Sequence, residues 1–394
     1  MNHLAPGRPL LKPQSRLPGL DTLRSLAIVS VVIFHLAPFL PPSLSVVQRF
    51  GWIGVDLFFV LSGFLIGTQL LKPHAQGRPL GQSSILDFYR RRAFRILPAY
   101  LTVVALYLFV PLWREQPHLP AAWKLLTFTS NLFMHYPAEL AFSHAWSLCI
   151  EEHFYLILPL AVLALTRRPS LRKTLAAFTV LLLAGICLRW WELSHIVRAA
   201  SDDDLWPVFM KRIYYPTYTR LDGLLSGVAL ATLRLFRPQW WSRLESRGTA
   251  TFLTGTLLVL AAMATLGFDY PSPDRTLGVL LAFPLLSLGF TLWVASALAT
   301  NGPLKLRIPA TEQLATLAFS LYLTHKAVAH VARQSIPWLT NNRTWPAAAL
   351  TAILCLIAAT LLYRMVEVPF LHLRDRNQAL TTSPAAEPQT DPAI

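Results

Sequence analysis

The chain is a series of long apolar stretches separated by short polar segments. An apolar stretch of about 20 residues has the length needed to cross a bilayer core as a helix. The segment 113–146 is long enough to hold a further short element, and residues 123–133 are expected to form a re-entrant or interfacial helix. The pattern predicts an all-α polytopic membrane protein with ten transmembrane helices, at residues 21–40, 52–71, 96–112, 147–166, 174–191, 217–233, 249–267, 277–299, 313–333 and 346–366.

Composition and charge support this class and give it an orientation. Of 394 residues, 54% are hydrophobic and only 14% are charged, whereas a soluble domain carries about a quarter charged residues. Most Lys and Arg residues lie before the first span and in alternate loops, so both termini are expected in the cytoplasm. The net charge of +15 is thereby explained by topology and by contact with the lipid bilayer, without nucleic acid.

Three segments are expected along the chain. Residues 1–19 form a cytoplasmic N-terminal segment, 20–372 the membrane domain, and 373–394 a cytoplasmic disordered tail. Residues 1–19 lack the apolar core of a signal peptide, so the first span is expected to be an uncleaved signal anchor. Cysteines are isolated in or beside spans, which favours neither a disulfide framework nor a metal site: Cys149, Cys187 and Cys355.

The first span carries a charge at its start and an imidazole far inside it. Arg24 and His35 are eleven positions apart, which places them within about 20° of one helix face and about 16 Å apart along the axis. An ionisable side chain at such depth is costly and indicates a functional site. The alternative for His35 is a hydrogen-bond partner of another helix.

Other polar groups in or beside the spans divide by depth. Arg92 and Arg95 lie three apart at the cytoplasmic entrance, so both guanidinium groups are expected to hold one phosphate-bearing ligand. Positive-inside charge is the alternative explanation for this basic stretch. The outer half of the spans is expected to contain His35, Asp56, Glu151, Glu152, Arg220 and Asp222. Arg220 and Asp222 are equally well explained as a structural ion pair, and the glycines of the second span as packing residues.

Taken in order, these motifs resemble acyltransferase family 3, the integral-membrane O-acyltransferases. The resemblance covers residues 17–372. The matching pieces are Leu20-Asp21 through Arg24 to His35, Gly54-Val-Asp56 through Gly63, Arg92-x-x-Arg95, Trp146-Ser-Leu-x-x-Glu151 with Phe154-Tyr155, Arg220-Leu-Asp222-Gly, Ser320-Leu-Tyr322-Leu-x-His325 and Glu367-x-Pro369.

The resemblance implies a membrane-bound enzyme that transfers an acyl group, commonly acetyl, from cytoplasmic acyl-CoA to a hydroxyl group. The acceptors in this family are carbohydrates, glycans and glycosides, and the compartment is the inner membrane of a bacterium. Acyl-CoA enters as a co-substrate, so neither a permanently bound cofactor nor a metal is expected. Many members carry a fused extracytoplasmic hydrolase-like domain, and here such a partner is expected to be a separate protein.

The resemblance also suggests residue roles. His35 suits the general base because burial favours its neutral, proton-accepting form. Glu151 is the first candidate to orient the imidazole and Asp56 the second. CoA phosphates are expected at Arg92 and Arg95, with the thioester arm passing Arg24. The acceptor side or the helix packing is expected to involve Glu152, Tyr155, Arg220, Asp222, Tyr322 and His325.

Two other functions fit part of the pattern. A secondary transporter of a small anionic or sugar-containing substrate would also have about ten spans and buried charges. It would often show repeated halves, and the sequence has no such pairing. A glycan polymerase would need a larger outer loop than 113–146 or 192–216. The run 202–204 is expected to be an exposed acidic loop.

Overall fold

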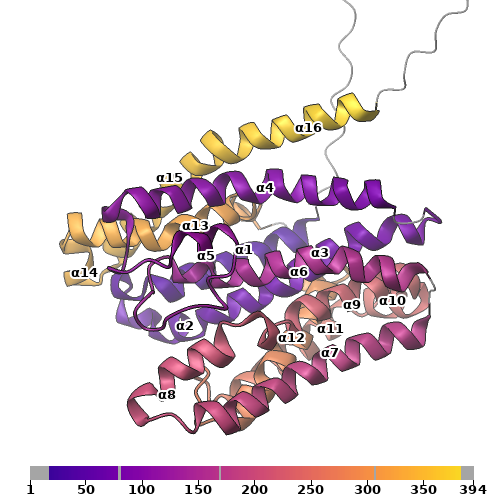
Figure 1. Ribbon diagram of the computed structural model, residues 1–394, viewed down its shortest axis with the longest axis horizontal. Coiled ribbons are helices and arrows are strands. Elements are labelled where there is room, and N and C mark those ends of the chain that lie inside the picture. Colours follow the sequence, from indigo (N-terminus) through magenta and orange to yellow (C-terminus); the bar gives the residue numbers. More distant parts are fainter. Residues whose placement is uncertain (1–16, 79–80, 168–169, 306–307, 383–394) are drawn as a thin grey trace, which may run out of the picture.

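The computed structural model describes residues 17–382, apart from 79–80, 168–169 and 306–307. Its long helices run side by side along a common axis (Figure 1). Each predicted span has one of them, so the all-α polytopic prediction is confirmed. They are α1 (Pro18–His35), α3 (Gly54–Ala75), α4 (Gln82–Phe109), α6 (Trp146–Arg167), α7 (Leu171–Glu192), α9 (Asp222–Phe236), α11 (Gly248–Thr265), α12 (Thr276–Leu298), α13 (Thr311–Ser335) and α15 (Trp345–Leu362).

Eight of the described helical segments are long and apolar enough to cross a membrane. The two long helices outside that set are α9, which has 15 residues, and α13, whose sequence includes His, Lys and Arg. Both carry polar groups into the middle of the bundle. The first is outside the set because it is short, and the second because polar residues interrupt its apolar stretch.

Short elements join the long helices at the two ends of the bundle. Figure 1 shows α2 (Ser45–Phe50), α8 (Asp202–Phe209) and α14 (Trp338–Asn342) at one end, which we term the α8 end. At the other end lies α10 (Pro238–Glu245). The remaining short turns are 3₁₀ at Ala37–Phe39, Pro42–Leu44, Gly51–Ile53, Pro111–Trp113, Ser143–Ala145, Thr217–Thr219 and Pro303–Lys305, and π at Leu193–Val197, Met210–Tyr214 and Tyr363–Glu367.

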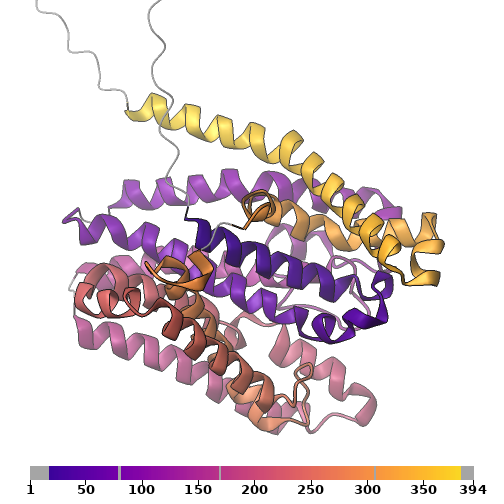
Figure 2. The same cartoon turned by 180° about the vertical axis from the view of Figure 1, so that it is seen from behind.

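The last helix differs from the expected tail. A π turn after α15 leads into α16 (Val368–Thr382), which runs obliquely away from the bundle (Figure 2). The disordered tail was expected from residue 373, so its first ten positions are helical instead. Residues 383–394 lie outside the described part of the chain.

Two other local expectations need correction. The segment 123–133 contains only α5 (Ala122–Leu126), followed by turns rather than a longer helix. The acidic run 202–204 is exposed as expected, but it forms the first turn of α8 rather than a loop. Carboxylates are favourable there because the N-terminus of a helix is partially positive.

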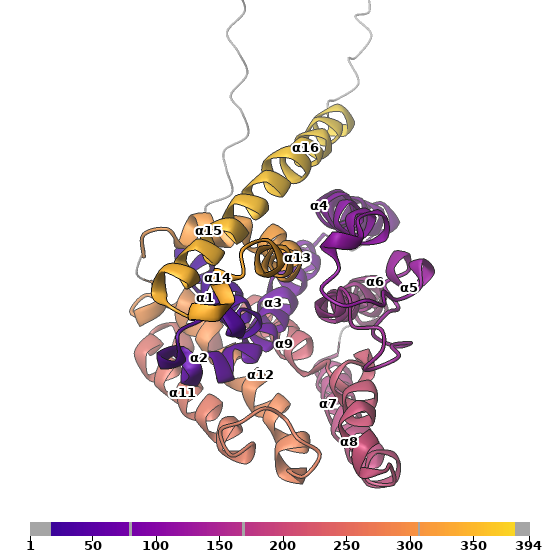
Figure 3. The same ribbon diagram turned by 90° about the vertical axis from the view of Figure 1, so that its left-hand side faces the viewer.

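Glycines allow the central pair of helices to pack closely. Seen along the bundle, α1, α3, α9 and α13 lie inside the outer helices (Figure 3). A Cβ atom at Gly63 of α3 would lie 2.1 Å from the carbonyl oxygen of Leu224, and one at Gly227 of α9 would lie 2.2 Å from that of Val60. Only glycine permits this contact, so the packing role considered for the second span is supported. This contact packs the first half of α3 against the first half of α9.

The first helix packs along α13. The hydroxyl of Ser25 donates to the carbonyl oxygen of Thr311 at 2.6 Å. At the far end, α1 stops at His35, earlier than the predicted residue 40. Pro38, Pro41 and Pro42 explain the early end, because proline disfavours the helical conformation of the residue before it and cannot donate a backbone hydrogen bond. His35 therefore lies at the end of the helix and not deep within it.

Candidate functional site

Two histidines from different helices meet at the α8 end of the bundle. His35 is the last residue of α1, and His325 lies in the second half of α13. The Nδ1 atom of His35 lies 3.0 Å from the Nε2 atom of His325, and the ring centroids are 5.0 Å apart. The sequence predicted a role for each residue separately, and the structure joins them as a histidine pair.

The hydrogen-bond partners assign a proton position to each ring of the histidine pair. Nδ1 of His325 lies 3.1 Å from the carbonyl oxygen of Leu321 and 2.9 Å from that of Tyr322. Because a carbonyl oxygen only accepts, this Nδ1 carries the hydrogen, and Nε2 of the neutral ring is left to accept. The neutral form is favoured because His325 is fully buried. His35 therefore donates from its own Nδ1, which leaves its Nε2 lone pair free.

A third histidine, which the sequence analysis missed, packs against this pair. The ring of His144 lies 5.1 Å from that of His325 and 6.3 Å from that of His35, measured between centroids. His144 is 2% exposed, and its Nδ1 has no hydrogen-bond partner among the described residues. The sequence could have indicated His144 as a candidate site residue, because it lies two residues before the Trp146-Ser147 motif.

Tyr322 connects α13 to the start of α6. Its hydroxyl donates to the carbonyl oxygen of His144 and lies 2.6 Å from the hydroxyl of Ser147. Since the single tyrosine proton is already used, Ser147 is the donor in the second bond. Tyr322 lines the same pocket as His35, whereas His325 is not among its lining residues and lies behind His35.

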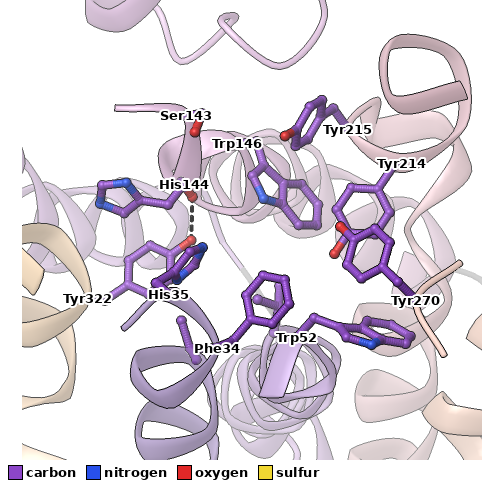
Figure 4. Close-up of a pocket in the computed structure, with 12 residues that line it drawn as sticks. Phe34, His35, Trp52, Ser143, His144, Trp146, Tyr214, Tyr215, Tyr270 and Tyr322 are labelled. Carbon is purple, nitrogen blue, oxygen red and sulfur yellow. Dashed lines mark hydrogen bonds between the residues drawn. The ribbon is translucent and has the colours of Figure 1, made fainter. Parts of the chain in front are cut away.

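A small pocket opens beside His35 at the α8 end. Its volume is about 70 Å³. Figure 4 shows His35 on one side of it and Tyr214, Tyr270 and Trp52 on the opposite side. We term this site the aromatic pocket, and its lining comprises Val31, Phe34, His35, Trp52, Val55, Ser143, His144, Trp146, Tyr214, Tyr215, Tyr270 and Tyr322.

Two buried ion pairs lie behind this pocket, and they differ from the expected one. Arg220 does not pair with Asp222. Instead its Nη2 lies 2.9 Å from Asp56, while Asp222 accepts two hydrogen bonds from Arg189 at 2.7 and 3.0 Å. Arg189 was missed, although a buried charge at the end of the span 174–191 was a usable signal. The two pairs attach α9 to α3 and to α7.

Arg220 also stabilises the aromatic wall of the pocket. Its guanidinium carbon lies 3.8 Å from the ring centroid of Phe283, 4.8 Å from that of Tyr214 and 5.1 Å from that of Trp146. Cations are attracted to the faces of such rings. Because Tyr214 and Trp146 line the pocket, Arg220 positions its wall from behind.

The expected carboxylate partners of His35 are committed elsewhere. Glu151 accepts hydrogen bonds from Ser62, at 3.0 Å, and from Tyr155, and Asp56 is paired with Arg220. Within the described chain neither carboxylate hydrogen-bonds to His35, so that expectation is wrong for this structure. The other carboxylate of the motif, Glu152, is half-buried, and its Oε1 has no partner among the described residues.

Three side chains of α6 instead form a polar stripe along one helix face. Ser147, Glu151 and Tyr155 are spaced four residues apart and therefore lie above one another. The stripe leads away from the aromatic pocket towards Arg92, whose guanidinium lies 5.1 Å from the centroid of the Tyr155 ring.

The three arginines expected to hold the donor occupy different environments. Arg92 is half-buried and lies 3.5 Å from the side-chain oxygen of Gln69, whereas Arg95 is exposed. Arg24 forms an ion pair with Asp21 at 3.4 Å. The two-arginine clamp is thus not assembled in this structure, because Arg92 is turned towards the rings of α4 and α6.

A lysine at the rim of the pocket was also missed. Lys326 lies 3.0 Å from Glu115 and 2.9 Å from the hydroxyl of Ser143. These contacts join α13 to both ends of the segment 113–146. They hold that segment next to the histidine pair.

Comparison of the sequence with known protein families identifies the family of this chain. A family model described as an acyltransferase domain matches residues 17–364. The chain belongs to acyltransferase family 3. The resemblance found in the motifs is thereby confirmed, and this acyltransferase-family chain is a multi-pass membrane protein.

Similar proteins of this family are bacterial. The O-acetyltransferase OatA of Staphylococcus aureus (strain NCTC 8325 / PS 47) is 30% identical over 229 residues, which cover 55% of this chain and 34% of OatA. YrhL of Bacillus subtilis (strain 168) carries the provisional name peptidoglycan O-acetyltransferase. It is 29% identical over 377 residues, which cover 90% of this chain and 54% of YrhL.

The chain spans about half or less of the length of these two relatives. No solved structure matches this family member.

Proposed function

We propose that this protein transfers an acyl group, acetyl in the first instance, from acyl-CoA to a hydroxyl group of a carbohydrate. The observation that carries the proposal is the free Nε2 of His35 at the aromatic pocket. The names of the relatives support the same chemistry, since both include O-acetyltransferase. Peptidoglycan, which the name of YrhL includes, is the acceptor class to test first.

The proposed reaction is a direct transfer with His35 as the general base. Nε2 of His35 takes the proton from the acceptor hydroxyl as its oxygen attacks the thioester carbonyl carbon. The new C–O bond forms, the C–S bond breaks, and the electron pair leaves with the CoA thiolate. The proton then passes from His35 to this thiolate, so the products are an ester and free CoA. His325 accepts a hydrogen bond from Nδ1 throughout and keeps the ring oriented.

We propose that the donor approaches along the polar stripe of α6. Arginine binds phosphate groups well because its planar guanidinium donates two parallel hydrogen bonds. Arg95 is exposed and Arg92 lies next to Tyr155 at the end of the stripe, so these side chains are candidates for the CoA phosphates, with Arg24 as a third. Glu151 and Tyr155 would then border the thioester arm and not orient His35.

The remaining predicted residues are proposed to position the pocket. Tyr322 fixes the start of α6, and Arg220 with Asp56 supports the aromatic wall. Asp222 is proposed to act indirectly, because its hydrogen bonds to Arg189 attach α9 to α7. Glu152 keeps an unpartnered oxygen near Arg92 and is a candidate on the donor side.

The proposal is tested by replacing His35 in the full chain. The His35→Ala variant should reach the membrane in normal amounts and lose transfer by about 10²- to 10⁴-fold, the contribution of a general base. The measurement is CoA release from acetyl-CoA in detergent, together with mass spectrometry of ester-linked acetate on peptidoglycan fragments. His195→Ala is the matched control, since His195 is exposed and lies outside the pocket.

Two outcomes would contradict the proposal in different ways. Wild-type rates in the His35→Ala variant would remove the base assignment. A wild-type protein that moves a solute across vesicles without releasing CoA would instead be a transporter.

A further inference from the structure

The aromatic pocket continues outward to an exposed tryptophan on α8. Tyr270, in the connection between α11 and α12, lies 5.9 Å from Phe34, 5.6 Å from Trp52 and 5.3 Å from Tyr214, measured between ring centroids. All four rings line the pocket. Tyr270 also lies 5.6 Å from Trp206, which does not line it and is 36% exposed. Tyr270 thus connects the pocket to an aromatic surface.

The orientation of Trp206 is fixed by its neighbours. Its indole N–H donates to the hydroxyl of Tyr136 at 3.1 Å. Its ring is stacked on Phe209, with centroids 5.6 Å apart and an interplanar angle of 29°. Tyr136 in turn lies 6.2 Å from Tyr215, which lines the pocket. Trp206 is therefore joined to the pocket through Tyr270 and through Tyr136, and its ring is held in place while partly exposed.

The size of the pocket determines what must remain outside it. A cavity volume of about 70 Å³ has room for about five to seven water molecules, since each needs about 10–15 Å³ of such space. An acetyl group and one edge of a single sugar ring fit such a space, whereas two linked sugar rings do not. The sugar unit next to the acylated one must then lie outside the pocket.

Aromatic rings are suitable neighbours for sugar rings at this position. One face of a pyranose is made of C–H groups, and its edge carries hydroxyl groups. Placing the C–H face on an indole removes apolar surface from water without burying the hydroxyls. Trp206 supplies such a face, and the loss of side-chain freedom on binding is small because its ring is already fixed.

We propose that Trp206 forms a second carbohydrate subsite, which holds the sugar unit next to the one that is acylated. The preferred acceptor is then a chain of at least two sugars and not a monosaccharide or small glycoside. This inference rests on the proposed transfer to a carbohydrate. It adds a specificity-determining residue outside the pocket.

Binding to a short and a long probe tests this subsite. The full chain in detergent is titrated with N-acetylglucosamine and with its β-1,4-linked tetramer, and both affinities are measured by calorimetry. Wild-type protein should bind the tetramer at least tenfold more tightly than the monomer. Trp206→Ala should weaken tetramer binding about tenfold and leave monomer binding unchanged, and Trp206→Tyr should restore part of the difference.

An interfacial role for Trp206 is the competing explanation, because tryptophan is common at membrane surfaces. Trp345→Ala is the matched control, since Trp345 is 61% exposed at the start of α15 and does not line the pocket. The subsite is contradicted if wild type binds the two probes equally or not at all, or if the Trp206 and Trp345 variants change alike. Acetyl transfer from acetyl-CoA is measured in a separate assay, so a failure of the proposed function can be distinguished from a failure of the subsite proposal.

Discussion

His325 occupies the position at His35 where a carboxylate was expected. In many catalytic sites a carboxylate holds the second nitrogen of the base and selects its tautomer. Here a neutral imidazole accepts from Nδ1 of His35 at 3.0 Å, and two backbone carbonyls define the tautomer of His325 itself. The base is thus oriented through the backbone of α13. His325 acts through His35 and is a positioning residue.

Replacing His325 should slow turnover more than it weakens binding. His325→Leu removes the acceptor, so His35 samples other ring orientations and tautomers, and kcat should fall about 10²-fold or more. The KM for acetyl-CoA should change little, because His325 does not lie beside the arginines. His325→Gln places an amide oxygen near the former Nε2 and should recover part of kcat. Equal kcat values for the Leu and Gln variants would contradict the positioning role.

Among the helices, the apolar stretches predicted well where each one lies but not how the helices face one another. A membrane helix must satisfy its backbone internally and stay apolar outside, so its position is recorded in its own sequence. The end of α1 was misplaced because the proline-rich turn after His35 was included in the span. The partner of Arg220 could not be predicted, since Asp56 lies 164 positions away and meets it only through the packing of α3 on α9. Arg220 and Asp222 are too close in sequence to face each other.

Breaking the ion pair between α3 and α9 should destabilise the protein more than removing both charges. Arg220→Met leaves Asp56 as an uncompensated charge that is 2% exposed, and a loss of about 3–5 kcal/mol is expected for such a change. The double variant Asp56→Asn, Arg220→Met should regain much of that stability. Thermal unfolding in detergent measures both variants. The interpretation is wrong if the double variant is as unstable as the single one.

For the whole molecule, the candidate site and the basic loops lie at opposite ends of the bundle. Trp206 belongs to α8 at one end of the bundle, whereas α10, which includes Arg243, lies at the other end (Figure 1). A donor bound at the basic end would therefore have to pass its acyl group along the bundle. The positive-inside pattern predicts that the basic end faces the cytoplasm.

Cysteine labelling tests this orientation. In a background without Cys149, Cys187 and Cys355, single cysteines are placed at Arg78 and Asp203, which are both exposed. An impermeant maleimide added to intact cells should label position 203 and should label position 78 only after the membrane is opened. The reverse labelling pattern would show that the protein has the opposite orientation in the membrane.

The neutral character of the histidine pair has an energetic consequence for turnover. A histidine bound to a carboxylate becomes part of a neutral ion pair when it gains a proton, whereas His35 becomes a cation whose hydrogen-bond partner, His325, is neutral. Burying a charge without a counter-ion is costly. The ring therefore gives up its proton readily to the departing sulfur and is soon ready for the next acceptor.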